Sequence, residues 1–174
     1  MKFPTLEDIL ENKKCERIVS LVGLIFPFLE VHVVLGPKVL CSTTNADFNI
    51  FFKTHLVGPI AELYGSQINH MISFGLMVVI FDVCVRKRIP LTLFSRFNII
   101  QGVLLDIICS FFGIAYYSQL TYLVRESVFG ELLANAAYFS IIGFILYSIF
   151  MILFGRYPKI PIVSEGARLN VQLF

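Results

Sequence analysis

Long apolar stretches, separated by short polar segments, dominate the chain. Four of them meet or approach the roughly 20 residues that a helix needs to cross the roughly 30 Å hydrocarbon core of a bilayer. The four stretches cover residues 18–35, 68–85, 97–117 and 132–154. The first ends at Gly36-Pro37-Lys38, a helix stop, and the second ends at the basic cluster Arg86-Lys87-Arg88. The pattern predicts an all-α integral membrane protein built as a bundle of four transmembrane helices.

The segment between the first two spans is too long for a simple turn and has a helical periodicity of its own. Within residues 46–64 the apolar positions that recur at helical spacing are Phe48, Phe51, Phe52, Leu56, Ile60 and Leu63. Pro59 can open a second short helix, because proline is tolerated in a first turn. We expect an amphipathic helix that lies in the membrane interface instead of spanning it. It would either plug the outer end of the bundle or shape the membrane surface.

Composition supports a membrane protein and argues against most enzyme classes. The chain is 57% hydrophobic and 15% charged, with a mean hydropathy of +0.80, whereas soluble domains are about 45–50% apolar and about 25% charged. The net charge of +2 is too small to suggest a nucleic-acid partner. The sequence contains no motif of hydrolases, metalloproteases, P-loop proteins or haem proteins. The four cysteines show no metal-ligand spacing. We therefore expect no catalytic residue, no cofactor and no metal.

Positive charges are concentrated at one end of the predicted bundle. The amino-terminal segment (1–17), the second loop and the tail (155–174) together carry eleven Lys and Arg residues, against three in the first and third loops. Such residues gather on the side of the membrane where a protein is made, so both termini are expected there. The amino-terminal segment mixes Glu7, Asp8 and Glu11 with its lysines. This composition is unlike that of a cleaved signal or transit peptide, so we expect the segment to be retained.

Three acidic residues fall within the predicted spans, where ionisable groups are costly and usually face the interior of a bundle. Asp82 precedes Arg86 by four residues, which predicts a local ion pair at the membrane surface. Glu30 follows a kink expected at Pro27, and Asp106 lies in the third span. Glu30 and Asp106 could line a polar pathway for ions, protons or a polypeptide. Alternatively, they are structural groups that hold a small bundle together, and the residues alone favour this second interpretation.

Small and polar residues form a stripe along each of the last two spans. In the third span the stripe contains Asn98, Gly102, Asp106, Cys109 and Gly113, with Gln101 beside it. In the fourth span it contains Ala136, Ser140, Gly143 and Tyr147. Stripes of this composition mark tight helix–helix contacts and not lipid-facing surfaces. We expect the two stripes to pack against each other or against the first span.

Three stretches of the chain resemble one protein family. The third-span segment SRFNIIQGVLLDI, Ser95 to Ile107, closely resembles the signature of the 20-kDa subunit family of the translocon at the inner envelope of chloroplasts. The matching positions are Arg96, Phe97, Asn98, Gln101, Gly102, Leu104, Leu105 and Asp106. FPFLE at Phe26 to Glu30 is similar to the first span of that family, and GRYPKIPIVSEGARLNV at Gly155 to Val171 is similar to its tail.

The resemblance implies a non-enzymatic, four-span subunit of a larger complex that moves precursor proteins across the plastid inner envelope, with both termini in the stroma. Its implied partners are other translocon subunits and transiting precursors, with membrane lipids around it. The resemblance is stronger to the plastid-encoded and cyanobacterial branch, so a cyanobacterial plasma or thylakoid membrane is the alternative location. We predict that Arg96, Asn98, Gln101 and Asp106 form a buried polar cluster, with Glu30 as its neighbour.

Two other functions stay open at this point. The chain could be an accessory or assembly subunit of a photosynthetic membrane complex, with a binding role and no transport. It could also be a small ion channel or transporter that acts as a homo-oligomer, because four spans in one chain rarely enclose a pore alone. The proteins that co-purify with the chain in mild detergent would separate these functions.

Overall fold

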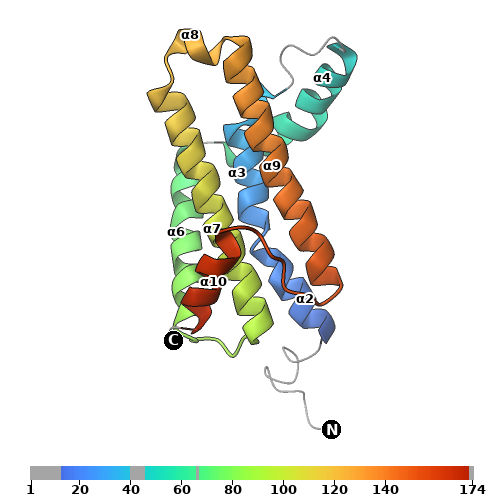
Figure 1. Ribbon diagram of the computed structural model, residues 1–174, viewed down its shortest axis with the longest axis vertical. Coiled ribbons are helices and arrows are strands. Elements are labelled where there is room, and N and C mark those ends of the chain that lie inside the picture. The colour runs from blue at the N-terminus through green and yellow to red at the C-terminus, as the bar shows by residue number, and fades with distance from the viewer. Residues whose placement is uncertain (1–12, 40–45, 66, 173–174) are drawn as a thin grey trace.

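The computed structural model describes residues 13–39, 46–65 and 67–172, and every regular element within them is a helix. Most of the predicted amino-terminal lead-in, residues 1–12, lies outside this part. Three helical segments are long and apolar enough to cross a membrane, namely Lys13–Val34, Leu93–Gln119 and Val128–Leu153. Ile72–Val85 is a shorter apolar helix. All four run along the long axis of the molecule in Figure 1.

The first of these segments is broken into two helices. Helix α2 covers Lys13–Val22 and α3 covers Ile25–Val34. Pro27 lies in the first turn of α3 and has no N–H to donate to the carbonyl of Gly23 one turn earlier, so the helix cannot continue regularly through that point. The kink predicted at Pro27 is therefore present, and it takes the form of a break at Gly23 and Leu24.

Two short helices with a π-helical turn between them lie at the end of the bundle where the first span ends. A 3₁₀ turn over Gly36–Lys38 ends the first span. Later residues form α4 (Ala46–Phe52), a π-helical turn (Lys53–Val57) and α5 (Gly58–Tyr64). Pro59 lies in the first turn of α5, as predicted. In Figure 1, α4 projects beside the upper end of α9.

Two of the remaining helices, α7 and α9, begin at a side-chain cap. Helix α6 (Gln67–Val85) is followed by α7 (Leu93–Ile114). The Thr92 hydroxyl caps the first turn of α7, because it accepts a hydrogen bond from the Ser95 N–H at 3.2 Å. A π-helical turn (Ala115–Gln119) and the short α8 (Tyr122–Arg125) lead to α9 (Val128–Leu153). Ser127 caps α9 in the same way. The predicted Asp82–Arg86 ion pair is confirmed at 2.6 Å.

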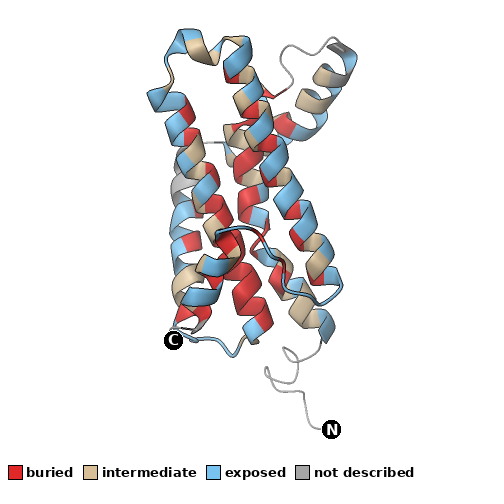
Figure 2. Cartoon of the chain, viewed as in Figure 1, coloured by how far each residue is buried: buried red, intermediate tan, exposed pale blue. Residues whose placement is uncertain are grey.

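Helix α7 is the central helix of the molecule. Every residue from Phe94 to Val103 is buried (Figure 2), which is unusual for a helix that a lipid bilayer surrounds. The reason is that α2, α3, α6 and α10 (Val163–Gln172) all pack against α7, on different sides. A helix that is enclosed on all sides can carry polar residues without exposing them to lipid.

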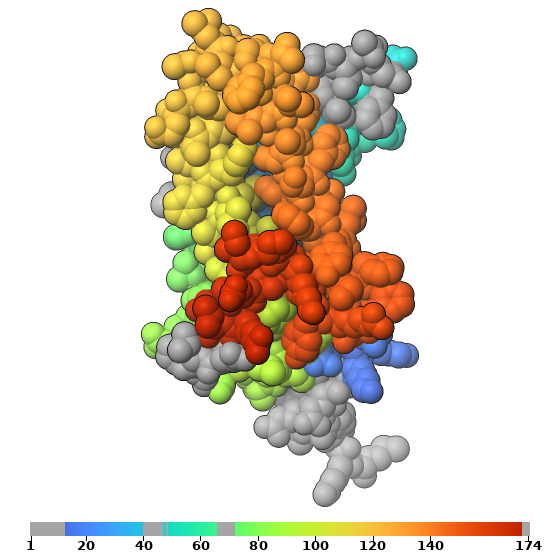
Figure 3. All heavy atoms as spheres, in the orientation of Figure 1, coloured from blue at the N-terminus to red at the C-terminus, as the bar shows by residue number. Residues whose placement is uncertain are grey.

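The tail folds back onto this central helix. Gly155 adopts a positive φ of 67° where the chain turns after α9. The chain then rises along the bundle and returns as α10, which lies across α7 in Figures 1 and 3. Val163, Ala167 and Val171, spaced four residues apart, are the buried stripe of α10. The predicted tail is therefore part of the packed structure.

Helix α9 packs through a face that the sequence did not indicate. Its buried residues include Ala134, Tyr138, Ile141, Ile145 and Ile152. The stripe predicted for this span, Ala136, Ser140 and Gly143, is exposed, so the expected packing of that stripe on the third or first span needs correction. The larger apolar side chains on the other face bury more surface against α2 and α3, and they determine which face turns inward.

Candidate functional site

The break in the first span is where its backbone touches the backbone of α7. A Cβ atom built on Gly102 would overlap the carbonyl of Gly23, and one built on Gly23 would lie 2.6 Å from the Ile99 Cα. Both positions therefore need glycine for steric reasons. Further along the same face, a Cβ on Gly113 would overlap the Val34 side chain. The third-span stripe thus lies against the first span.

A polar cavity opens one to two turns beyond this glycine contact. Its volume is about 180 Å³. Four helices contribute to its lining, which consists of Glu30 from α3, Tyr64 from α5, Ser73 and Phe74 from α6, and Asp106 and Ser110 from α7. Asp106 lies at the middle of the Leu93–Gln119 segment. Two carboxyl groups and three hydroxyl groups therefore face one small space in the interior of an apolar bundle.

Hydrogen bonds order part of the cavity wall. The Ser110 hydroxyl donates to Glu30 Oε1 at 3.0 Å, and the hydroxyls of Tyr64 and Ser73 lie 2.5 Å apart. Burial raises the pKa of Tyr64 to about 12, and the charges of the two carboxylates raise it as well. The Tyr64 hydroxyl therefore keeps its proton at physiological pH and can donate it in a hydrogen bond.

Among the cavity residues, Asp106 has a side-chain oxygen for which the described part of the chain provides no hydrogen-bond donor. Its side chain is 6% exposed, and its Oδ1 atom has no hydrogen-bond partner among the described residues. Nor does any cationic side chain line this cavity. A buried carboxyl group without a partner costs free energy, so a group or solvent that can donate to it would be favoured here. The arrangement is suited to holding water or a cationic group.

The five residues predicted as one polar cluster are all buried, but they occupy separate places. Glu30 and Asp106 share the cavity. Arg96 lies about 15 Å away along α7, since ten residues separate it from Asp106. Its guanidinium donates to the carbonyls of Cys84 (2.6 Å) and Val85 (3.2 Å), at the carboxyl end of α6. Arg96 therefore caps a helix.

Asn98 and Gln101 lie between these two places, each 1% exposed. The Asn98 amide donates to the Phe94 carbonyl at 2.8 Å, which is a contact within α7. The Asn98 Oδ1 and both polar atoms of Gln101 have no hydrogen-bond partner in the described part of the chain. These amides extend the polar interior from the cavity toward the charged end of the bundle.

Sequence reasoning missed the three hydroxyl-bearing residues of the cavity wall, and Phe74 as well. Ser110 lies one turn after Asp106, and this spacing of four residues could have identified it. No local sequence pattern marks Tyr64 or Ser73 as part of a cavity. Only the way α5 and α6 meet α3 and α7 brings these two to the cavity. Among the described residues, no group of three or more His, Cys, Asp and Glu side chains could hold a metal ion.

A separate polar contact joins the first and fourth spans. His32 Nδ1 lies 2.6 Å from the Phe28 carbonyl, which can only accept, so in the neutral ring this nitrogen carries the proton. The Tyr138 hydroxyl then donates to His32 Nε2 at 3.0 Å. Both side chains are buried. This contact fixes the position of α9 relative to α3.

Removing this hydrogen bond should have a small, measurable effect. We expect Tyr138→Phe to lower the free energy of unfolding in detergent by about 1 kcal/mol, the usual scale for a hydrogen bond between membrane helices. Tyr122→Phe is the matched control, because Tyr122 is 68% exposed, and its change should be near zero. Equal effects of the two substitutions would show that the Tyr138–His32 contact does not stabilise the bundle.

Comparison with known proteins decides which family this architecture represents. The family model described as "Chloroplast import apparatus Tic20-like" matches residues 2–167. The chain belongs to the Tic20 family. It is accordingly a multi-pass membrane protein of a non-enzymatic family that forms part of the chloroplast import apparatus. The resemblance carried by the third span is thereby confirmed.

The relatives come from red algae and a cyanobacterium. The Tic20 family protein Ycf60 of Gracilaria tenuistipitata var. liui is 27% identical over 168 residues, which cover 95% of this chain and 79% of that protein. The Ycf60 protein of Porphyra purpurea is 30% identical over 160 residues, covering 90% and 75%. A Tic20 family protein of Synechocystis is 29% identical over 100 residues, covering 58% and 62%. No solved structure matches the chain.

Proposed function

We propose that this chain is a four-span subunit of the plastid inner-envelope import translocon, and that it helps precursor proteins cross the membrane as part of a larger complex. The supporting observation is the Glu30–Asp106 cavity, together with membership of the Tic20 family. A polar space inside a bundle can accept a hydrated segment or a partner helix without exposing charge to lipid. The family is non-enzymatic, and in this proposal the chain works through partners.

Two contacts at the ends of the bundle support the proposal of four spans. The Arg17 guanidinium donates to the Leu153 carbonyl at 2.8 Å, which holds the start of the first span and the end of the last at one end of the molecule. An ion pair between Lys38 and Glu126 joins the first and third loops at the opposite end. These contacts support α6 as the helix that returns the chain across the bundle. The 19 residues of α6 extend about 28 Å, close to the thickness of a hydrocarbon core.

The segment from α4 to α5 is suited to the membrane interface. Phe51 and Leu63 are 61% and 79% exposed, so this segment offers apolar side chains to a bilayer surface. Its buried Val57 packs against Gly36 at the end of the first span. We assign it as an interfacial helix that closes the outer end of the bundle and contributes Tyr64 to the cavity.

The charge distribution orients this arrangement, and thiol labelling tests the orientation. With both termini in the stroma, Cys15 should resist a membrane-impermeant maleimide that is added outside intact plastids or vesicles. A cysteine introduced by Ser118→Cys, in the exposed turn after α7, should react. Cys84 and Cys109 are buried and should stay silent, and Cys41→Ser removes the remaining thiol. Strong labelling at Cys15 with none at Ser118→Cys would reverse the orientation.

Affinity isolation in mild detergent tests the functional assignment. The tagged chain should co-purify with translocon subunits and with precursors arrested in transit. Asp106→Leu should insert into the membrane normally but lose most of this association, whereas Asp47→Leu, which changes an exposed carboxylate of α4, should behave as the parent chain does. Recovery of photosystem subunits would support an accessory role in photosynthesis instead. Full association of Asp106→Leu would refute a role for the cavity.

The two carboxyl groups of the cavity also favour one other function, a small cation-conducting oligomer. In that case the purified chain alone, reconstituted in lipid vesicles, should conduct cations, and Glu30→Gln should abolish the current. The translocon proposal predicts that the isolated chain supports no such Glu30-dependent conductance.

A further inference from the structure

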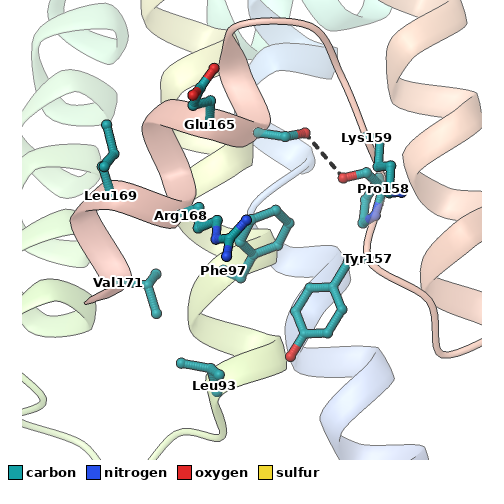
Figure 4. Close-up of a pocket in the computed structure, with 10 residues that line it drawn as sticks. Leu93, Phe97, Tyr157, Pro158, Lys159, Glu165, Arg168, Leu169 and Val171 are labelled. Carbon is teal, nitrogen blue, oxygen red and sulfur yellow. Dashed lines mark hydrogen bonds between the residues drawn. The ribbon is translucent and has the colours of Figure 1, made fainter. Parts of the chain in front are cut away.

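A second, larger hollow lies at the start of α7, whereas the polar cavity lies around Asp106 and Ser110, farther along the helix. It is a groove of about 700 Å³ between the start of α7, the link after α9, and helix α10. Figure 4 shows the side chains that face it. The Ser164 hydroxyl donates to the Pro158 carbonyl at 3.0 Å, and the Ile160 N–H donates to the same hydroxyl oxygen at 2.6 Å. These bonds hold the link and α10 together, so the groove is built by the fold itself.

The walls that α7 and α10 contribute to this groove are largely apolar. Phe97 is buried, and its ring packs edge-to-face on the Tyr157 ring with centroids 5.1 Å apart. Leu93 and Leu169 line the groove from either side and are 57% and 55% exposed. Apolar side chains left open in a preformed groove favour an apolar occupant.

Two cationic side chains stand at the edge of the groove. Lys159 comes from the link and Arg168 from α10. Neither side chain has an ion-pair partner in the described part of the chain. Glu165 also borders the groove, but Figure 4 shows that it extends to the opposite side of α10 from Arg168. The edge of the groove is therefore positively charged, and its charge is available to a ligand.

The groove lies toward the end of the bundle that carries the basic cluster Arg86-Lys87-Arg88, an end that we expect at the level of the lipid headgroups. Val171 of α10 packs with Cys84 and Val85, at the end of α6 just before the basic cluster Arg86-Lys87-Arg88. Toward its start, α10 reaches deeper, since Gly166 lies against Leu104 of α7. Helix α10 therefore runs from the level of Leu104 down to the end of the bundle that carries the basic cluster, with its apolar stripe against α7.

We propose that this groove binds one anionic membrane lipid. Lys159 and Arg168 would contact the charged headgroup, while an acyl chain would lie along Phe97, Leu93 and Leu169. The argument rests on charge and depth together: basic pockets beside transmembrane helices recognise anionic headgroups, and the groove continues from such a site into an apolar space. A soluble anion would contact only the charged edge of the groove. A neutral lipid would contact only its apolar wall.

Native mass spectrometry of the purified full-length chain tests the proposal. The chain is titrated in mild detergent with phosphatidylglycerol, and separately with phosphatidylcholine that carries the same acyl chains. We expect one phosphatidylglycerol molecule to bind at least about tenfold more tightly than phosphatidylcholine, since each cation near a lipid headgroup strengthens binding severalfold. The double variant Lys159→Gln/Arg168→Gln should lose this preference.

A matched control separates this site from a general effect of charge. Lys13→Gln/Lys87→Gln removes the same charge from exposed residues that do not line the groove, and it should keep the preference. Inorganic phosphate at millimolar concentration should not displace the lipid. Equal binding of the two lipids, displacement by phosphate, or loss of the preference in the control variant would each overturn the proposal.

Discussion

We expect Gly102→Ala to lower the free energy of unfolding more than alanine at any other glycine of the chain. The new Cβ would occupy the space of the Gly23 carbonyl, and a backbone atom cannot move aside by changing rotamer. The first span would have to separate from α7, which would disturb the packing along the whole stripe from Asn98 to Gly113. Overpacking of this kind costs about 3 kcal/mol. The measurement is the free energy of unfolding in detergent, followed by circular dichroism.

The chain supplies two matched controls for this substitution. A Cβ at Gly143 in α9 or at Gly75 in α6 would meet nothing within 4 Å. Alanine there should be neutral or stabilise the chain by up to about 1 kcal/mol, because it replaces glycine inside a helix. If Gly102→Ala and Gly143→Ala behave alike, the first span and α7 do not touch at Gly23 and Gly102.

Arg96→Met should have the second-largest effect. The substitution keeps most of the side-chain volume but removes the donors to the carbonyls of Cys84 and Val85. These carbonyls end α6 in a buried place, so they would lose partners that water cannot easily replace. We expect a loss of about 3 kcal/mol in the free energy of unfolding. Hydrogen exchange should increase mainly at the carboxyl end of α6.

Arg88→Met is the control for this prediction. Arg88 is 57% exposed and pairs with Asp82 at 3.1 Å at the surface, an interaction that contributes less than about 1 kcal/mol. Arg96→Lys should recover part of the loss, because an ammonium group can donate to these carbonyls but only from one nitrogen, without the planar fork with which Arg96 reaches both. Equal destabilisation by Arg88→Met and Arg96→Met would contradict the assignment of Arg96 as the cap of α6.

The helices themselves were predictable because hydropathy and helix breakers act locally. The apolar runs and the basic cluster at Arg86-Lys87-Arg88 define the spans, and Pro27 signals the break in the first. The structure adds that Gly23, one turn earlier, is the residue that meets α7. That contact depends on which helix lies opposite, which no local pattern states.

The direction in which each helix faces was harder to predict. On α7 the small and polar stripe turns inward, whereas on α9 the similar stripe of Ala136, Ser140 and Gly143 faces outward. The difference arises because α7 is enclosed by its neighbours and α9 packs on one side only. The return of α10 onto α7 was also not indicated, since ten residues with three buried apolar positions resemble any surface helix.

The sequence predicted which residues of the candidate site are buried, but not which of them meet. Burial of Glu30 and Asp106 follows from their position in apolar spans, because charge avoids lipid. Their meeting in one cavity, with Tyr64 and Ser73, requires the tertiary arrangement of four helices. Arg96 belonged to the same sequence motif as Asp106, but helical rise places it about 15 Å away, near the start of α7.

Disulfide trapping of an arrested precursor tests the central proposal most directly. A variant without native cysteines receives either Ser110→Cys, in the cavity wall, or Ser140→Cys, on the exposed face of α9. The two substitutions are chemically identical, and a disulfide forms only when two Cα atoms come within about 7 Å. We predict that a precursor with a single cysteine, halted during import, is trapped at Ser110→Cys and not at Ser140→Cys. Trapping at Ser140→Cys alone, or at neither position during active import, would contradict the proposal that the cavity borders the path of the precursor.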